Sequence, residues 1–137
     1  MNANLQTINN PDHPLATVIV DHFALDIDLI DDANQPIGRP WLSIAVDQYS
    51  RMITGFHLSL ETPNNVSFAK CLANAIFPKD ELLASHGIEA DWNTSGLMKE
   101  LVTENIYSSV SEDVKNACIR HGIRLVGLSS SYPRVKT

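Results

Sequence analysis

The sequence predicts an α/β domain built on a five-stranded mixed sheet. Three observations predict it: a β-branched run from Thr17 to Ile30, two strand-like stretches joined to it by short connections, and two later helix–strand units. Short connections favour antiparallel neighbours, whereas strands joined through a helix favour a crossover and a parallel pairing. The expected order is therefore β-β-β-α-β-α-β, with helices on the faces of the sheet.

The first strand, expected over Thr17–Ile30, carries an acid in an unusual position. Side chains alternate between the two faces of a strand, so one face takes the apolar series Ile19, Phe23, Leu25, Ile27 and Leu29 together with Asp21. The other face takes His22, Ala24, Asp26 and Asp28 and looks solvated. A carboxylate facing a core is costly unless a metal, a cation or a set of donors compensates it. Asp21 is therefore the acid that requires a functional explanation, and pairing with an arginine or with backbone donors is the structural alternative.

The remaining elements follow from turn and capping signals. Strands are expected over 41–46 and 52–60, and Asp47, in the turn between them, is expected to bond its own backbone. A helix opens at Asn64 or Asn65 and ends at Pro78, and a short helix is expected over 80–85. A fourth strand covers 99–104, a helix opens with the capping-box spacing of Ser109 and Glu112 and stops at Gly122, and a fifth strand covers 123–128.

Length and composition limit the class of protein. A chain of 137 residues is one domain on length grounds, with residues 1–16 as an irregular lead-in and the domain over 17–137. A formal net charge of −6 argues against a stand-alone nucleic-acid binder. Cys71 and Cys118 lack metal-binding spacing and are interpreted as small core residues. No apolar run reaches membrane-spanning length, so we expect no membrane partner and a soluble cytoplasmic protein.

The topology also suggests where a second acid meets the first. The fourth strand can lie beside the first, and Glu104, at its end, would then face Asp21 across the sheet. A solvated acid at a strand end is the alternative interpretation of Glu104. The basic residues Arg39, Arg51, Arg134 and Lys136 are scattered, which is more typical of a solvated surface than of a DNA-binding patch, so the DNA-contacting residues remain unassigned.

Two stretches carry a family resemblance. Val20-Asp21-His22-Phe23 and the segment from Ile37 to Phe56, with Gly-Arg-Pro followed by Asp-Gln-Tyr-Ser-Arg-Met-Ile-Thr-Gly-Phe, resemble the catalytic core of DDE transposases and retroviral-type integrases. The closer resemblance is to the Mu-like branch of bacterial transposases. It implies a ribonuclease H-like fold, DNA cleavage and strand transfer dependent on Mg²⁺ or Mn²⁺, and DNA partners at mobile-element ends and target sites. It also implies a homo-oligomer.

The same resemblance implies which residues form the site and how active the chain is. Asp21 matches the family's first aspartate, and Glu104 stands where the family has its second, so both are expected as catalytic residues and metal ligands. The family's third acid would follow Thr137, so the domain is expected to be truncated at its C-terminal end. We expect weak metal binding and an inactive or impaired fragment. The alternative is a non-catalytic relic or an oligomerisation and interaction domain that retains the fold, and a general ribonuclease H-like nuclease is a weaker option.

Overall fold

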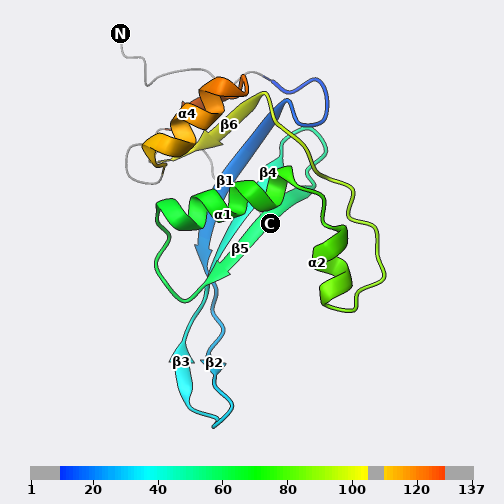
Figure 1. Ribbon diagram of the computed structural model, residues 1–137. Helices are drawn as coiled ribbons and strands as arrows, with labels where there is room; N and C mark the ends of the chain where they lie inside the picture. Colours follow the sequence, from blue (N-terminus) through cyan, green and yellow to red (C-terminus); the bar gives the residue numbers. More distant parts are fainter. Residues whose placement is uncertain (1–9, 105–109, 129–137) are drawn as a thin grey trace.

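A five-stranded mixed sheet forms the centre of the computed structural model, which describes residues 10–104 and 110–128. The sheet order is β5-β4-β1-β6-β7. Its strands are β1 (Thr17–Ala24), β4 (Trp41–Asp47), β5 (Ile53–Ser59), β6 (Glu100–Thr103) and β7 (Arg124–Gly127). β1 pairs antiparallel with β4 and parallel with β6, and β6 pairs parallel with β7. The predicted α/β class, five-stranded sheet and placement of the fourth sheet strand beside the first are confirmed, and β1 lies at the centre (Figure 1).

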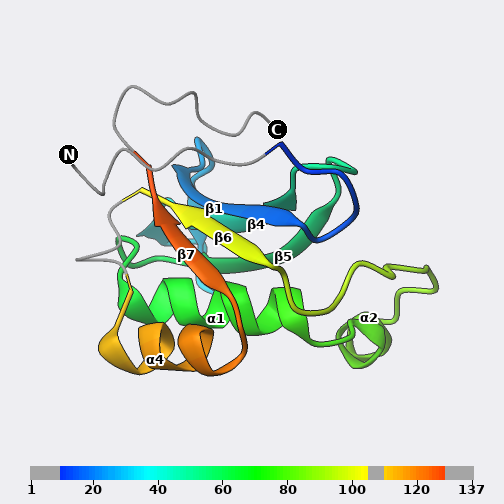
Figure 2. The same ribbon diagram turned by 90° about the horizontal axis from the view of Figure 1, so that it is seen from above.

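Two helices cover one face of this sheet. They are α1 (Asn65–Ile76) and α4 (Glu112–Arg120), which lie side by side beneath the strands in Figure 2, while the short α2 (Asp80–Ser85) stands apart from the sheet. α1 starts where the sequence predicts, because the Asn64 side chain accepts the backbone N–H groups of Val66 and Ser67 and so satisfies two orphan donors of the first turn. Its last residue is Ile76, and the C-cap Phe77 comes directly before Pro78.

The main hydrophobic core lies between the sheet and these two helices. Buried side chains from the strands, from both helices and from the segments beside them form one cluster: Val18, Val20, Ala45, Phe68, Cys71, Leu72, Ala75, Met98, Leu101, Val110, Cys118 and Ile123. Both cysteines belong to it, as predicted. Burial raises the pKa of the Cys71 thiol to about 12, and it also raises the pKa of Cys118.

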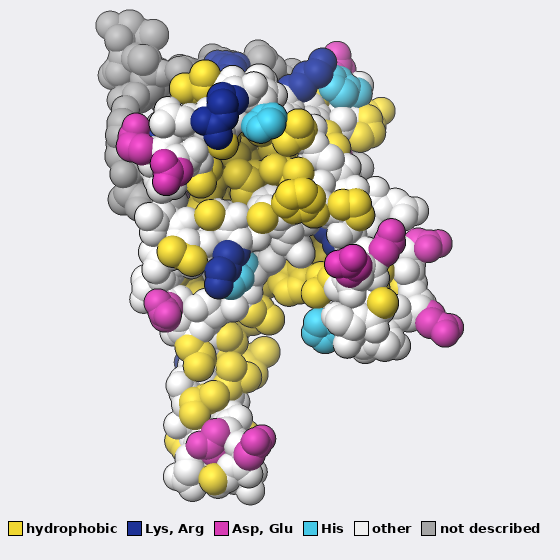
Figure 3. Space-filling view, viewed as in Figure 1, with side chains coloured by type: hydrophobic (Ala, Val, Ile, Leu, Met, Phe, Trp, Pro, Cys, Tyr) yellow, Lys and Arg dark blue, Asp and Glu magenta, His cyan; other side chains and the backbone are white. Residues whose placement is uncertain are grey.

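The prediction of one strand over Thr17–Ile30 is wrong beyond Ala24. The last backbone bond of the β1–β4 ladder runs from Leu25 N–H to the carbonyl of Pro40, and a proline has no N–H with which to continue the ladder. The chain therefore leaves the sheet and pairs with itself as β2 (Leu29–Ile30) and β3 (Pro36–Gly38). The resulting two-stranded arm projects from the body of the molecule (Figure 1), and hydrophobic side chains run along it in Figure 3.

The face predicted to be solvated is exposed at Ala24, Asp26 and Asp28 and half-buried at His22, but the same face is covered earlier in the strand. Val18, Ile19 and Val20 are 0%, 4% and 2% exposed, so both faces of the first half of β1 are buried. A central strand that is covered on both faces has a continuous run of apolar residues, so its sequence does not show the alternation of apolar and polar residues that marks a half-buried strand. The helices cover the face of Val18 and Val20, so Asp21 lies on the opposite face from the main core.

The N-cap of α4 lies two residues after the one predicted. Ser111 is the N-cap, and its hydroxyl accepts the N–H of Val114, whereas the predicted cap Ser109 lies outside the described residues. Within 10–104 and 110–128, the helices are all too short or too polar to cross a lipid bilayer.

Candidate functional site

Asp21 is a buried acid in the second half of the central strand. Asp21 is only 6% exposed, and its register partner on β4 is the buried Ile44. One carboxylate oxygen, Oδ1, accepts the backbone N–H of His22 at 2.8 Å. This bond holds the carboxylate close to its own backbone and compensates part of the cost of burial. The next residue on the opposite face, His22, is tied by its Nδ1 to Ser43 Oγ at 2.6 Å.

Glu104 directly follows the neighbouring strand β6, which ends at Thr103. It is half-buried, as expected of a residue at a strand end. The register of the parallel pair aligns Thr17 with Glu100 and Ile19 with Val102. The pairing ends at Ile19 and Val102. Extending its register by two residues would align Asp21 with Glu104, and because partners in a parallel pair project to the same face, both acids would then share the face of Ile19.

This pairing supplies two oxygen ligands of the kind that hard divalent cations prefer. Mg²⁺ keeps several of its waters and is commonly bound through one or two carboxylates together with substrate phosphates. Asp21, within β1, and Glu104, directly after β6, carry carboxylates of the type that such an ion takes as ligands. Across residues 10–104 and 110–128, no three His, Cys, Asp or Glu side chains gather closely enough to hold a metal ion by themselves.

Asp47, the other buried acid of the first strands, has a structural role. Its Oδ2 accepts the backbone N–H and the hydroxyl of Ser50, at 3.1 Å and 2.6 Å, and its Oδ1 accepts the N–H of Leu15. The predicted turn role is confirmed, and the bond to Leu15 additionally fixes the segment that leads into β1.

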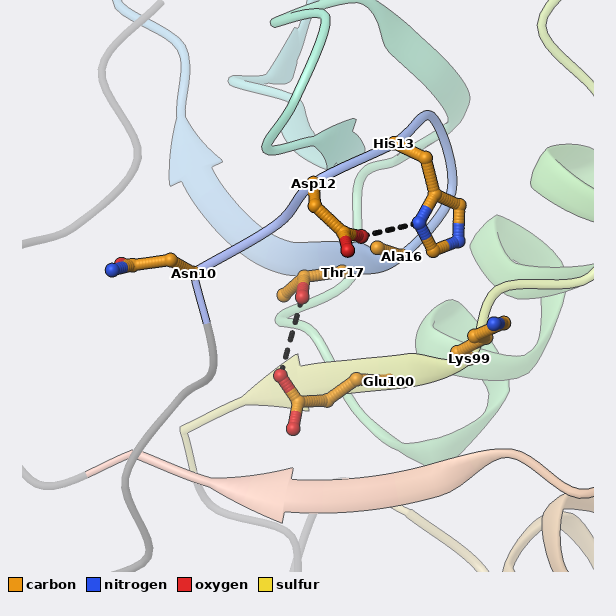
Figure 4. A pocket seen from close by; sticks show the side chains of 7 residues that line it. All are labelled: Asn10, Asp12, His13, Ala16, Thr17, Lys99 and Glu100. Carbon is orange, nitrogen blue, oxygen red and sulfur yellow. Dashed lines mark hydrogen bonds and ion pairs between the residues drawn. The ribbon is translucent and has the colours of Figure 1, made fainter.

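A small pocket opens at the other end of β1 and β6, four residues before the two acids. It has a volume of about 280 Å³ and is lined by Asn10, Asp12, His13, Ala16, Thr17, Lys99 and Glu100 (Figure 4). A hydrogen bond from His13, together with its charge, holds the pKa of Asp12 below its usual value. Glu100 is 4% exposed and bonds Thr17 and Arg124. Sequence reasoning passed over Glu100, because an acid at the start of a short strand shows its burial only once its neighbours are known.

A buried lysine was also missed. Lys79 is 1% exposed, and its Nζ donates to the carbonyls of Ala75, Phe77 and Thr94 while lying 5.6 Å from the ring centre of Trp92. Burial lowers the pKa of Lys79. These bonds join the end of α1 to the long segment before β6, which is a structural role. The only sequence signal was a lysine directly after Pro78, at the carboxyl end of a helix.

The family model of the TnsB C-terminal domain matches residues 19–137, almost the whole chain. The chain belongs to the TnsB C-terminal domain family. The match begins inside β1 and includes Asp21 and Glu104 as well as the helices.

Two curated transposition proteins are similar to this TnsB-family chain. The transposition protein TnsB of transposon Tn7 from Escherichia coli is 39% identical over 90 residues, which are 62% of this chain and 13% of that protein. The transposase for transposon Tn552 from Staphylococcus aureus is 31% identical over 114 residues, which are 83% of this chain and 22% of that protein. The TnsB-family chain therefore spans less than a quarter of the length of either relative.

Solved retroviral integrases share the fold. A chain of the simian T-cell lymphotropic virus intasome in complex with PP2A regulatory subunit B56 gamma aligns with 93% of this chain and 36% of its own, at a TM-score of 0.58 and 14% identity. The HTLV-2 integrase catalytic core domain in complex with magnesium aligns with 86% of this chain and 63% of its own, at a TM-score of 0.57 and 14% identity. The expected ribonuclease H-like fold is confirmed, and so is the relation to transposases and integrases at the level of the family.

Proposed function

We propose that this chain is the central part of a DDE-type catalytic core, of the Mu-like branch, that takes part in metal-dependent DNA cleavage and strand transfer. Asp21 and Glu104 are its catalytic residues and metal ligands, and Mg²⁺ or Mn²⁺ is the metal. One observation carries the proposal: Asp21 is a buried aspartate in the central strand of a TnsB-family domain, and Glu104 directly follows the strand that pairs parallel with it.

The residues around this pair prepare it for a cation. The His22 N–H fixes one Asp21 oxygen, and the buried Ile19 and Ile44 exclude water from the strand beside it. Charges in a water-poor environment interact more strongly than in bulk water, so these carboxylates would hold a cation more firmly than acids at a surface. A divalent ion held there would supply activation of the attacking hydroxyl and stabilisation of the leaving oxygen in phosphoryl transfer.

The acid at position 104 limits activity. A glutamate is one methylene longer than the aspartate expected there, and displacements of about 1 Å can cost about a hundredfold in rate. We therefore propose that Glu104 impairs strand transfer and that the metal is weakly bound.

The proposed partners are DNA and further copies of the protein. DNA at mobile-element ends and target sites would supply phosphate oxygens to the metal. The formal net charge of −6 means that this stretch contributes little to the overall attraction for DNA. We accordingly propose that the basic contacts to DNA come from elsewhere in an oligomeric assembly.

Metal binding is the direct test. Free Mn²⁺ is titrated with the chain and followed by its electron paramagnetic resonance signal, and Asp21→Asn and Glu104→Gln are compared with wild type. We expect saturable binding that Asp21→Asn abolishes and Glu104→Gln weakens. Asp26→Asn is the matched control, because the Asp26 side chain is 90% exposed on the arm. Mn²⁺ binding that ignores both acids, or no binding at all, would contradict the proposal.

A non-catalytic interaction domain is the second candidate, and the projecting arm favours it. Three isoleucines of the arm region, Ile27, Ile30 and Ile37, are 54%, 57% and 46% exposed, which is typical of a contact surface. Nicking of supercoiled plasmid in Mn²⁺ that Asp21→Asn abolishes would exclude this candidate. Asp21-dependent Mn²⁺ binding without any nicking would favour an ancestral site that no longer performs chemistry.

A further inference from the structure

Glu100 joins three neighbouring strands at a single level of the sheet. Thr17 on β1, Glu100 on β6 and Arg124 on β7 are direct register partners, and we call them the polar rung. The two Glu100 oxygens are each used: Oε1 accepts the Thr17 hydroxyl at 3.2 Å, and Oε2 accepts Arg124 Nη1 at 2.6 Å. Thr17 and Glu100 are 2% and 4% exposed, so the bond between them, drawn as a dashed line in Figure 4, is buried.

The polar rung lies on the same face as the two proposed metal ligands. Two residues further along the three strands comes an apolar level, formed by Ile19, Val102 and Val126. Two residues beyond that come Asp21 and Glu104. Side chains separated by two residues in a strand share a face, so the polar rung, the apolar level and the acid pair form one column. The polar rung is at the opposite end of this column from the acids.

A shift of β6 by two residues along β1 would keep every side chain on its face of the sheet. It would also separate Ile19 from Val102 and so break the apolar level. The same shift would set Glu100 opposite Ile19 and leave a buried carboxylate without the Thr17 hydroxyl, which is costly. It would also move Asp21 about 6.6 Å along the strand relative to Glu104.

We propose that Glu100 is a positioning residue: its bond to Thr17 fixes the β1–β6 register that sets Asp21 beside Glu104. The inference rests on the proposed metal site and adds to it the residues that align its two ligands. Glu100 and Thr17 do not touch the metal in this arrangement. They act through the strands, over a distance of four residues on each.

Thr17→Val is the primary test, because it keeps the shape of the side chain and removes only the bond to Glu100. Thr54→Val is the matched control. Thr54 is 1% exposed, and its hydroxyl donates to the Ala45 carbonyl at 3.2 Å, between β5 and β4 and not between β1 and β6. Glu100→Leu is the stronger variant, since it removes both bonds and leaves an apolar side chain. Mn²⁺ affinity is measured for each by paramagnetic resonance titration, and the melting temperature is measured in parallel.

We expect the two threonine variants to lose similar thermal stability, whereas only Thr17→Val weakens Mn²⁺ binding, by about threefold. Glu100→Leu is expected to weaken it by about tenfold or more. A folded Thr17→Val protein that binds Mn²⁺ as wild type does would overturn the positioning role, and it decides the matter even if Glu100→Leu does not fold. Equal weakening by Thr54→Val would also overturn it. Failure of the proposed function gives a different result, because the wild-type protein itself would then show no Mn²⁺ binding that depends on Asp21.

Discussion

Gly55 is the point of closest approach between the sheet and α1, and replacing it with alanine should damage the fold severely. A Cβ added at this position would lie 2.5 Å from Ala75 N, 2.7 Å from Ala75 Cα and 2.8 Å from Ala75 Cβ. Carbon contacts are comfortable only from about 3.5 Å. The helix would therefore have to withdraw by up to about 1 Å along a packed face, which opens gaps beside the buried Phe68 and Cys71.

The cost follows from the nature of the obstructing atoms. Overpacking a core costs about 1–3 kcal/mol, and we expect the upper end, because two of the three obstructing atoms are helix backbone and cannot rotate away. For a domain of this size, a loss of about 3 kcal/mol lowers the melting temperature by about 10 °C. Differential scanning calorimetry of Gly55→Ala measures it.

Two further variants isolate the cause. Gly122→Ala is the control, because Gly122 has φ +71° and no atom within 4 Å of an added Cβ, so it bears only a backbone cost of about 1 kcal/mol. Adding Ala75→Gly to Gly55→Ala should restore little stability, since the contacts to the Ala75 backbone remain. A Gly55→Ala protein that melts within about 2 °C of wild type would refute the reasoning.

Three other predictions concern titration, reactivity and capping. Burial raises the Cys71 pKa from 9.0 to about 12, so the folded state holds the thiol proton more tightly and the free energy of unfolding should fall as the pH rises from 9 towards 12. Iodoacetamide at neutral pH should modify Cys71 only after denaturation. Rapid labelling of the native protein would contradict this. Burial, and then the charge of Lys70, lower the His57 pKa below 6.5, so the contribution of His57 to stability is lost as the pH falls from 6.5 through the lowered pKa. Lys70→Gln should raise the His57 pKa in an NMR titration. An unchanged His57 pKa would exclude the effect of Lys70. Asn64→Ala should cost about 1–2 kcal/mol in urea unfolding through loss of the cap on α1, whereas Asn65→Ala, one residue inside the helix, should cost little; equal losses would contradict the capping role.

Local signals determined much of this protein from the sequence. Asn64 and the proline at position 78 bound α1 correctly, because capping and the missing proline N–H act over a few residues. The α/β class and the placement of the fourth sheet strand beside the first followed from connection lengths, which constrain topology without knowledge of contacts. Asp21 stood out as an acid within a β-branched run, and it is indeed buried.

Only the tertiary structure decided the rest. The end of β1 depended on Pro40, directly before the neighbouring strand β4, and the choice of face for Asp21 depended on which side of the sheet α1 and α4 cover. The role of Glu100 required the β1–β6 register, which joins residues 83 positions apart in the chain. Pairing across such a separation is set by the summed packing of the whole sheet and by buried polar bonds, and no local pattern encodes it.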